Sequence, residues 1–135
     1  MTAPRWSVVV PTFQRHETLA ACLTRLAPGA QRLEAGQYEV VVTDDARSDT
    51  TRAFLTDRFP WARWTAGPGR GPAANRNHGA REARGEWIAF TDDDCIAPTD
   101  WIEKIVLAFQ DQPDGELIYG QVIPAYPEDD GARLT

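Results

Sequence analysis

Short apolar runs alternate along the chain with segments whose apolar residues recur every three or four positions. The runs are rich in β-branched and aromatic residues and predict strands over residues 6–10, 38–43, 62–65, 87–91 and 117–122. The segments between them predict helices over residues 17–26, from Ser48 or Asp49 to about 59, over 73–84, and from 99 or 100 onward. Strands that alternate with helices form parallel sheets, so the pattern predicts an α/β domain, a three-layer sandwich around a mainly parallel sheet.

The apolar faces of these helices predict their contribution to the core. The expected core side chains are Leu19, Cys22, Leu23 and Leu26 in the first helix, Ala53, Phe54 and Phe59 in the second, and Ile102, Ile105, Val106 and Phe109 in the fourth. Gly79, with Asn77, is expected to allow close packing of the third helix. His16 and His78 are interpreted as structural residues, although the sequence reveals no partner for either.

Polar groups and turn residues follow each of the first four predicted strands. Pro11 and Thr12 follow the first strand, the pair at 44–45 the second, the loop "GPGRGP" at 67–72 the third, and three aspartates at 92–94 the fourth. Because right-handed crossovers bring the carboxyl ends of parallel strands to one edge, and ligands bind at that edge, these groups predict one site.

The stretch "FTDDDC" at residues 90–95 places three carboxylates side by side. Adjacent like charges oppose one another's ionisation, so the arrangement is unfavourable unless a cation lies among them. A Mg²⁺ ion held by one or two of these carboxylates and by substrate phosphates would neutralise the charge on a diphosphate leaving group. The alternative interpretation is a solvated acidic turn. Asp44 and Asp45 could likewise be only a turn and a helix cap.

Four motifs in register carry a resemblance to a known family. They are "SVVVPTFQRHETL", "VVVTDDARSDTT", "GPAANRNHGAREARGEWIAFTDDDC" and "APTDWIEKI", which together extend from residue 5 to about 123. In this order and spacing the chain resembles the nucleotide-binding half of a family 2 inverting glycosyltransferase of the GT-A fold. The resemblance implies a Rossmann-like α/β/α sandwich, shortened relative to the family, and a nucleotide-sugar-binding domain over residues 1–123.

The resemblance also implies roles for residues near the first three strands. Pro11 and Thr12 would contact the base and the ribose of the nucleotide. Asp45 would accept a hydrogen bond from the base, expected to be uracil, and Asp44 would support it. Arg70 would reach the diphosphate.

Further roles follow for the fourth strand and the helix before it. Arg76 matches the arginine of the family's A-R-N stretch, although Asn75 stands here in place of the preceding alanine. Asp92, Asp93 and Asp94 correspond to the family's D-x-D motif. Asp94 is the expected ligand of a Mg²⁺ or Mn²⁺ ion together with Asp92, and Asp92 and Asp93 would also bind the nucleotide.

The acceptor site and the general base of such enzymes belong to a later half, expected to lie outside this chain. Residues 124–135 are predicted to be a proline-containing acidic tail. The expected function is therefore donor binding for inverting transfer from a UDP-sugar to an unknown saccharide, lipid or protein hydroxyl, with this chain alone inactive. The alternative is a binding module or remnant that holds a nucleotide sugar without turning it over. An uncovered sheet edge would favour self-association.

Composition excludes several other classes of protein. The 135 residues are 42% hydrophobic and 25% charged, as in globular domains, and the formal net charge of −6 argues against nucleic-acid binding. The sequence has neither an apolar run of the ~20 residues that span a bilayer nor a signal peptide, which predicts a cytoplasmic location or one at the inner face of the membrane. A dinucleotide oxidoreductase would need a glycine-rich turn after the first strand, where "PTFQRH" contains no glycine.

Overall fold

The structure, a computed structural model, describes residues 4–111. The chain divides into two compact units, Met1–Lys104 and Ile105–Thr135, and the description below concerns the first of them. The predicted strand over 117–122, the predicted domain end at 123 and the predicted acidic tail lie outside the described residues.

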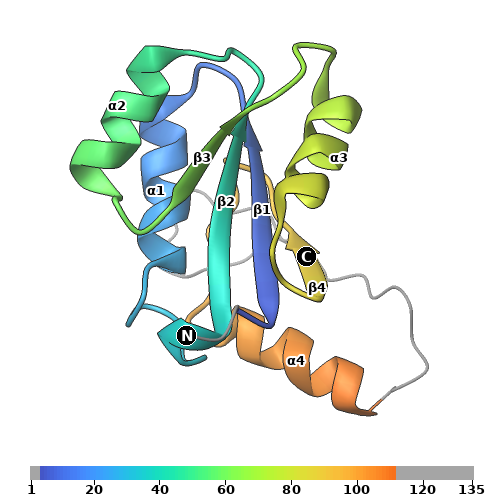
Figure 1. The fold of residues 1–135 in the computed structure, drawn as a ribbon. Coiled ribbons are helices and arrows are strands. Elements are labelled where there is room, and N and C mark those ends of the chain that lie inside the picture. The colour runs from blue at the N-terminus through green and yellow to red at the C-terminus, as the bar shows by residue number, and fades with distance from the viewer. Residues whose placement is uncertain (1–3, 112–135) are drawn as a thin grey trace, which may run out of the picture. The chain divides into compact units, whose positions relative to one another are not determined.

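A four-stranded parallel sheet forms the centre of the first unit (Figure 1). Its strands lie in the order β3-β2-β1-β4 and comprise β1 (Trp6–Thr12), β2 (Tyr38–Asp44), β3 (Arg63–Ala66) and β4 (Trp87–Phe90). All three strand pairings are parallel, and in the central pair the register sets Trp6 beside Tyr38 and Thr12 beside Asp44. The predicted α/β class and parallel sheet are confirmed.

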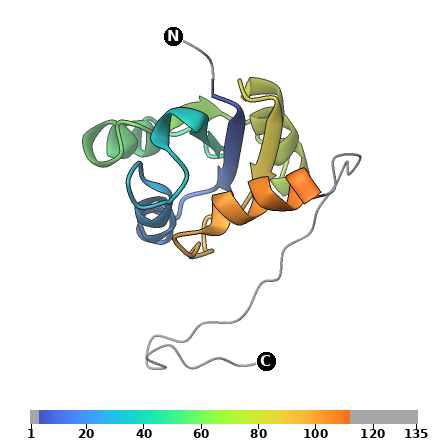
Figure 2. The ribbon, with the colours of Figure 1, turned by 90° about the horizontal axis from the view of Figure 1, so that it is seen from below.

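Helices lie on both faces of this sheet. They are α1 (His16–Leu26), α2 (Asp49–Arg58) and α3 (Pro72–Glu82), with a short 3₁₀ turn η1 (Ala35–Gln37) before β2. The last described helix, α4 (Trp101–Asp111), begins in the first unit and continues into the second. The crossovers from β1 to β2 and from β2 to β3 proceed in one direction along the sheet, whereas the connection from β3 to β4 returns past both. Right-handed crossovers therefore place α1 and α2 on one face and α3 on the other, as Figure 2 shows.

The central strands β1 and β2 carry most of the core. Their valines are 0–1% exposed, and the α1 face predicted from helical periodicity is equally buried. On the opposite face α3 approaches closely at Gly79, where an added Cβ would lie 2.5 Å from Val9 Cγ1 and 3.0 Å from Thr43 Cγ2. The predicted packing role of Gly79 is thus confirmed, but Asn77 is exposed and does not share it.

The first strand is longer than predicted. It continues through Pro11 to Thr12 instead of ending at Val10. Residue pairing with β4 stops at Val9, whose carbonyl accepts a hydrogen bond from Thr91 N at 3.2 Å. In a parallel strand alternate residues point their backbone groups to the same side, so Pro11 faces the β4 side two residues beyond the last pair, where no donor is needed.

The core residues predicted for α2 are partly wrong. Phe59 is buried as predicted, but Ala53 is exposed and Phe54 is half-buried, and the residues that the helix itself buries are Thr51 and Leu55. Phe54 stacks on the ring of His16 in α1, with centroids 4.9 Å apart, and its ring also lies 5.9 Å from that of Phe59. Ser48 is the N-cap, and its side chain accepts from Thr50 N, as one of the two predictions had it.

Both histidines have partners that the sequence did not reveal. His16 Nε2 lies 2.8 Å from Thr51 Oγ1, which joins the first turns of α1 and α2. His78 Nε2 lies 3.0 Å from Thr65 Oγ1, which joins α3 to β3.

In the described part of the chain, no helix combines the length and the apolar character needed to cross a bilayer.

Candidate functional site

The segments that follow the four strands lie side by side at the carboxyl edge of the sheet. Asp45 N donates to Thr12 O at 3.0 Å, which joins the ends of β2 and β1. Gly67 N donates to Asp44 O at 2.8 Å, which joins the loop after β3 to the end of β2. The bond from Thr91 to Val9 does the same for β4 and β1. The edge predicted to hold the site therefore does gather these segments.

Asp44 is enclosed in the turn that follows β2. Its side chain is 0% exposed, and its carboxylate accepts hydrogen bonds from Ala46 N at 3.0 Å, Ser48 N at 3.0 Å and Trp64 Nε1 at 3.1 Å. Three donors satisfy a buried carboxylate and fix the path from β2 into α2. Asp44 is thus held by the turn and the neighbouring strand, beside Asp45.

Asp45 organises the loop that follows β3. Its Oδ1 accepts from Gly69 N at 2.7 Å and its Oδ2 from Gly71 N at 3.0 Å. Both glycines have positive φ, 72° and 98°, a backbone region that other residues rarely adopt. The loop thereby holds Arg70 at the surface, where it makes no ion pair or hydrogen bond with the rest of residues 4–111. The guanidinium of Arg70 is therefore available to bind an anion.

The three aspartates after β4 occupy different environments. They lie on a turn closed by a hydrogen bond from Cys95 N to Asp92 O at 3.1 Å. Asp92 and Asp94 are exposed, whereas Asp93 is 5% exposed and accepts from Thr12 Oγ1 at 2.9 Å and from Arg15 Nη1 at 3.4 Å. The sequence shows three equivalent carboxylates, and the turn separates them into two that face solvent and one that faces inward.

Burial raises the pKa of Asp93 above its usual range. The hydrogen bond from Thr12 and the charge of Arg15 oppose that rise, while the neighbouring carboxylates of Asp94 and Asp92 add to it. Burial also raises the pKa of the Cys22 thiol to about 12, with Cys95 and the three aspartates contributing. Cys22 lies beneath this turn, and its Sγ is 3.5 Å from Asp92 O.

Arg76 extends from α3 to the aspartate turn. Its Nη2 lies 2.9 Å from Asp92 Oδ1, and both side chains are partly exposed. The residue before it, Asn75, is buried and bonds β2 twice: Thr43 Oγ1 donates to its Oδ1 at 2.7 Å, and its Nδ2 donates to Thr43 O at 2.9 Å. The asparagine that departs from the family motif thus fixes α3, and with it Arg76, against the sheet.

The exposed carboxylates of this turn fit a hard divalent cation. Ligand atoms of Asp92, Asp94 and Cys95 lie within 4.8 Å of one another. Mg²⁺ and Mn²⁺ prefer oxygen ligands, and a thiol suits softer metals, so of these three side chains the two carboxylates suit such an ion and Cys95 does not. Two carboxylates leave coordination positions for water and phosphate oxygens.

Two residues at this edge escaped the sequence-based prediction. Phe13, directly after β1, is 56% exposed, an unusual position for a large aromatic side chain. Arg15, at the N-cap of α1, bonds the buried Asp93. Phe13 could have been found from its place beside Pro11 and Thr12 at a strand end. No local signal marks the pairing of Arg15, because its partner lies 78 residues away.

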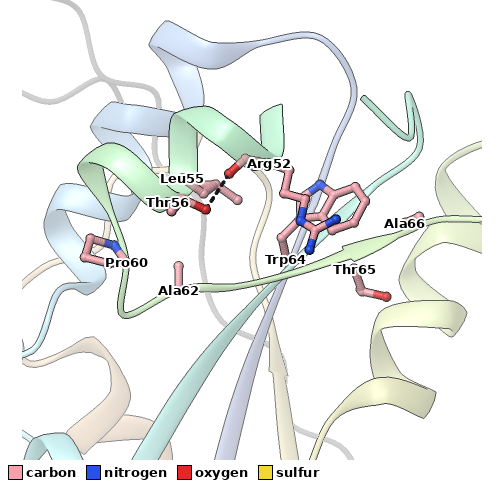
Figure 3. A pocket seen from close by; sticks show the side chains of 8 residues that line it. All are labelled: Arg52, Leu55, Thr56, Pro60, Ala62, Trp64, Thr65 and Ala66. Carbon is pink, nitrogen blue, oxygen red and sulfur yellow. Dashed lines mark hydrogen bonds between the residues drawn. The ribbon is translucent and has the colours of Figure 1, made fainter. Parts of the chain in front are cut away.

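A pocket of about 420 Å³ lies between α2 and β3 (Figure 3) and not at the aspartate turn. In it the guanidinium of Arg52 lies over the Trp64 ring, 5.4 Å from the ring centroid. None of the predicted site residues lines it, although two lining residues touch Asp44: Trp64 donates a hydrogen bond to its carboxylate, and Ala66 pairs with it in the sheet. Polar chemistry is concentrated at the carboxyl edge, so we take that edge, and not this pocket, as the site.

Fold and site together define a class: a Rossmann-like α/β domain with an acidic and basic constellation at the carboxyl edge of a parallel sheet. The family model for glycosyl transferase family 2 matches residues 7–133, and the chain belongs to this family. It is 29% identical over 114 residues to an uncharacterized glycosyltransferase of Haemophilus influenzae, a match that covers 84% of this chain and 37% of that protein. The chain spans between 28% and 48% of the length of the curated relatives that it matches.

Solved structures agree with this assignment. TarS of S. aureus superposes with a TM-score of 0.69 at 24% identity, over 81% of this chain and 20% of that one, which supports the fold. The mannosyltransferase PcManGT of Pyrobaculum calidifontis, solved with GDP-Man and Mn²⁺, superposes with a TM-score of 0.58 at 29% identity, over 72% of this chain and 29% of that one. The first 349 residues of TarS have also been solved with UDP and with UDP-GlcNAc.

Proposed function

We propose that this chain binds the donor of an inverting glycosyl transfer, a nucleotide-diphospho-sugar, through a divalent metal ion. The observation that carries the proposal is the aspartate turn, where Asp92 and Asp94 face solvent within ligand distance of each other and Arg76 lies beside them. The ion, Mg²⁺ or Mn²⁺, would neutralise charge on the departing diphosphate. The relatives' names and the Mn²⁺ in the PcManGT complex support the same assignment.

The chain's own residues would hold and orient the donor. Asp92 and Asp94 would bind the metal, and Asp92 would also contact the nucleotide. Arg76 and Arg70 carry the positive charges nearest to this turn and to the glycine loop, where they would bind the diphosphate. In the absence of donor, Asp92 is the partner of Arg76. When the donor binds, a phosphate would replace Asp92 as the partner of Arg76, and the metal ion would replace Arg76 as the partner of Asp92.

The base of the nucleotide would lie between Phe13 and Asp45. An exposed aromatic ring offers a stacking surface for a base. The carboxylate of Asp45 accepts two backbone hydrogen bonds and retains lone pairs for a donor N–H of uracil. Uracil presents its N3–H to such a carboxylate, and we propose a UDP-sugar as the donor. Thymine and guanine also carry N–H groups on that edge, so the test below compares all three nucleotides. Pro11 and Thr12, at the end of β1, would contact the base and the ribose.

Calorimetric titration tests the metal and the nucleotide together. UDP, GDP and dTDP would be titrated in Mn²⁺, in Mg²⁺ and in EDTA. We expect UDP to bind best and to lose most of its affinity in EDTA. Asp94→Asn should abolish the metal dependence, whereas Asp57→Asn, an exposed aspartate near the far end of α2, removes the same charge and should not. Equal affinity of the parent chain for UDP in Mn²⁺ and in EDTA would refute the metal role.

A second candidate function is donor binding without turnover. The general base and the acceptor site, which receives a saccharide, lipid or protein hydroxyl, are proposed to lie in parts of such an enzyme beyond this chain. Incubation with UDP-sugars, Mn²⁺ and mixed acceptors separates the two functions, because a binding module forms no glycosylated product.

The proposed location is the cytoplasm or the inner face of the membrane. Sedimentation of the same samples reports self-association through the sheet edge.

A further inference from the structure

We propose that Asp93, the middle residue of the aspartate turn, is a positioning residue that acts through Thr12 and Arg15 and does not itself touch metal or nucleotide. This inference rests on the proposed function and assigns separate work to the three carboxylates. Asp92 and Asp94 would meet the ligand, while Asp93 would fix the turn that carries them.

The contacts of Asp93 already use both of its carboxylate oxygens. Oδ2 accepts from Thr12 Oγ1 at 2.9 Å, and Oδ1 accepts from Arg15 Nη1 at 3.4 Å. Thr12 is itself 4% exposed, so this bond lies in the interior of the unit. An ion or a ribose at the surface would reach the carboxylates of Asp92 and Asp94 first.

The turn needs this connection because the backbone ladder stops before it. Residue pairing between β1 and β4 ends at Val9 and Phe90, and the last backbone bond between these segments joins Thr91 N to Val9 O. β1 then continues to Thr12 while the other segment leaves the sheet. The bond from Thr12 to Asp93 rejoins the two segments beyond that point, between side chains 81 residues apart in sequence.

Fixing this turn matters for metal binding. Mg²⁺ demands near-octahedral oxygen geometry, so ligands held in place before the ion arrives bind it more tightly. Burial makes the Thr12–Asp93 bond stronger than an exposed one of equal length, and a buried carboxylate left without its donor would shift outward to water. The position of Asp92 and Asp94 therefore depends on a hydroxyl that does not itself bind the ion.

The test is a double-mutant cycle that measures the ratio of UDP affinity in Mn²⁺ to that in EDTA. Thr12→Val removes the hydroxyl at nearly constant volume, and should lower this ratio by ~10-fold, the effect expected of one charge-assisted hydrogen bond. Thr12→Ser restores the hydroxyl and should recover most of the loss. Asp93→Asn still accepts from Thr12 and should lower the ratio less than Asp94→Asn does. In the Thr12→Val background, Asp93→Asn should add little.

Amide hydrogen exchange gives a readout independent of any ligand. Thr12→Val should speed exchange at Cys95 N–H, the donor that closes the turn, and leave the central β1–β2 ladder protected. The proposal is overturned if Asp93→Asn is as damaging as Asp94→Asn while Thr12→Val has no effect, because Asp93 would then be a direct ligand. A parent chain without metal dependence refutes the proposed function instead, and exchange at Cys95 still decides whether Thr12 fixes the turn.

Discussion

Replacement of Asp44 should remove a large part of this domain's free energy of unfolding, and Asp44 is not expected to contact a ligand. Its carboxylate is fully buried and accepts from two backbone amides and the Trp64 indole. A hydrogen bond to a charged group contributes ~1.5–3 kcal/mol, so three sum to roughly 4.5–9 kcal/mol if they are independent. They share one acceptor, and the half-buried donors can regain water when the turn opens. We therefore expect Asp44→Ala to cost ~3–5 kcal/mol, a large share of the ~5–15 kcal/mol typical of a domain.

Urea unfolding at pH 7, followed by tryptophan fluorescence and circular dichroism, measures this difference as a shift in midpoint at constant slope. Two matched variants bracket it. Trp64→Phe removes a single donor and should cost about a third as much. Asp49→Ala removes an exposed carboxylate in the first turn of α2 and should change stability by less than ~1 kcal/mol. A midpoint for Asp44→Ala within error of that for Asp49→Ala would refute the assignment of Asp44 to the fold.

Three further substitutions test separate parts of the structure. Arg76→Gln should weaken UDP by ~10-fold in calorimetry, yet leave Mn²⁺ binding by spin resonance equal or tighter, because Asp92 loses its competing cation. For Glu39, burial raises the pKa, but hydrogen bonds from Ser7, the Arg84 backbone and Arg63, with the charge of Arg63, outweigh it. The folded pKa therefore lies below the usual 4.5. Its stabilisation is present above pH 4.5 and is lost as pH falls through the folded value, so Glu39→Gln should lower the urea midpoint at pH 7, and this difference should shrink as pH falls below 4.5. Gly79→Ala should lower the melting temperature despite the better helix propensity of alanine, whereas Gly36→Ala, with no atom within 4 Å of the added Cβ, should not.

The sheet and its site edge could be predicted because their signals are local. A run such as "YEVVVT" predicts a buried strand because most of its residues are β-branched, and "GPGRGP" predicts a loop because glycine and proline break regular structure. The inner face of α2 could not be predicted in the same way. Ala53 and Phe54 look apolar in sequence, but tertiary packing turned Thr51 and Leu55 inward, and Thr51 is tolerable there only because His16 satisfies its hydroxyl.

Within the site, the sequence predicted which residues gather at the strand ends. It did not predict which of them face solvent and which are buried in contacts with the protein. Nothing in "DDD" distinguishes Asp93 from its neighbours, since the difference arises from a threonine 81 residues earlier. The same holds for Asn75, whose buried bonds to Thr43 are invisible until α3 is laid across β2. Long-range pairing decides these roles, and a single sequence carries no record of it.

The contacts at the carboxyl edge also bear on where catalysis must be completed. Inverting transfer needs a base within hydrogen-bond reach of the attacking hydroxyl. Of the five aspartates at the strand ends, Asp44 serves its turn, Asp45 the glycine loop and Asp93 the Thr12 contact, while Asp92 and Asp94 are the proposed metal ligands. A carboxylate whose oxygens are held by a metal ion or by donors of the protein itself is not placed to accept a proton from an acceptor hydroxyl. If these aspartates bind the donor as proposed, we expect the base that deprotonates the acceptor to be supplied by another segment.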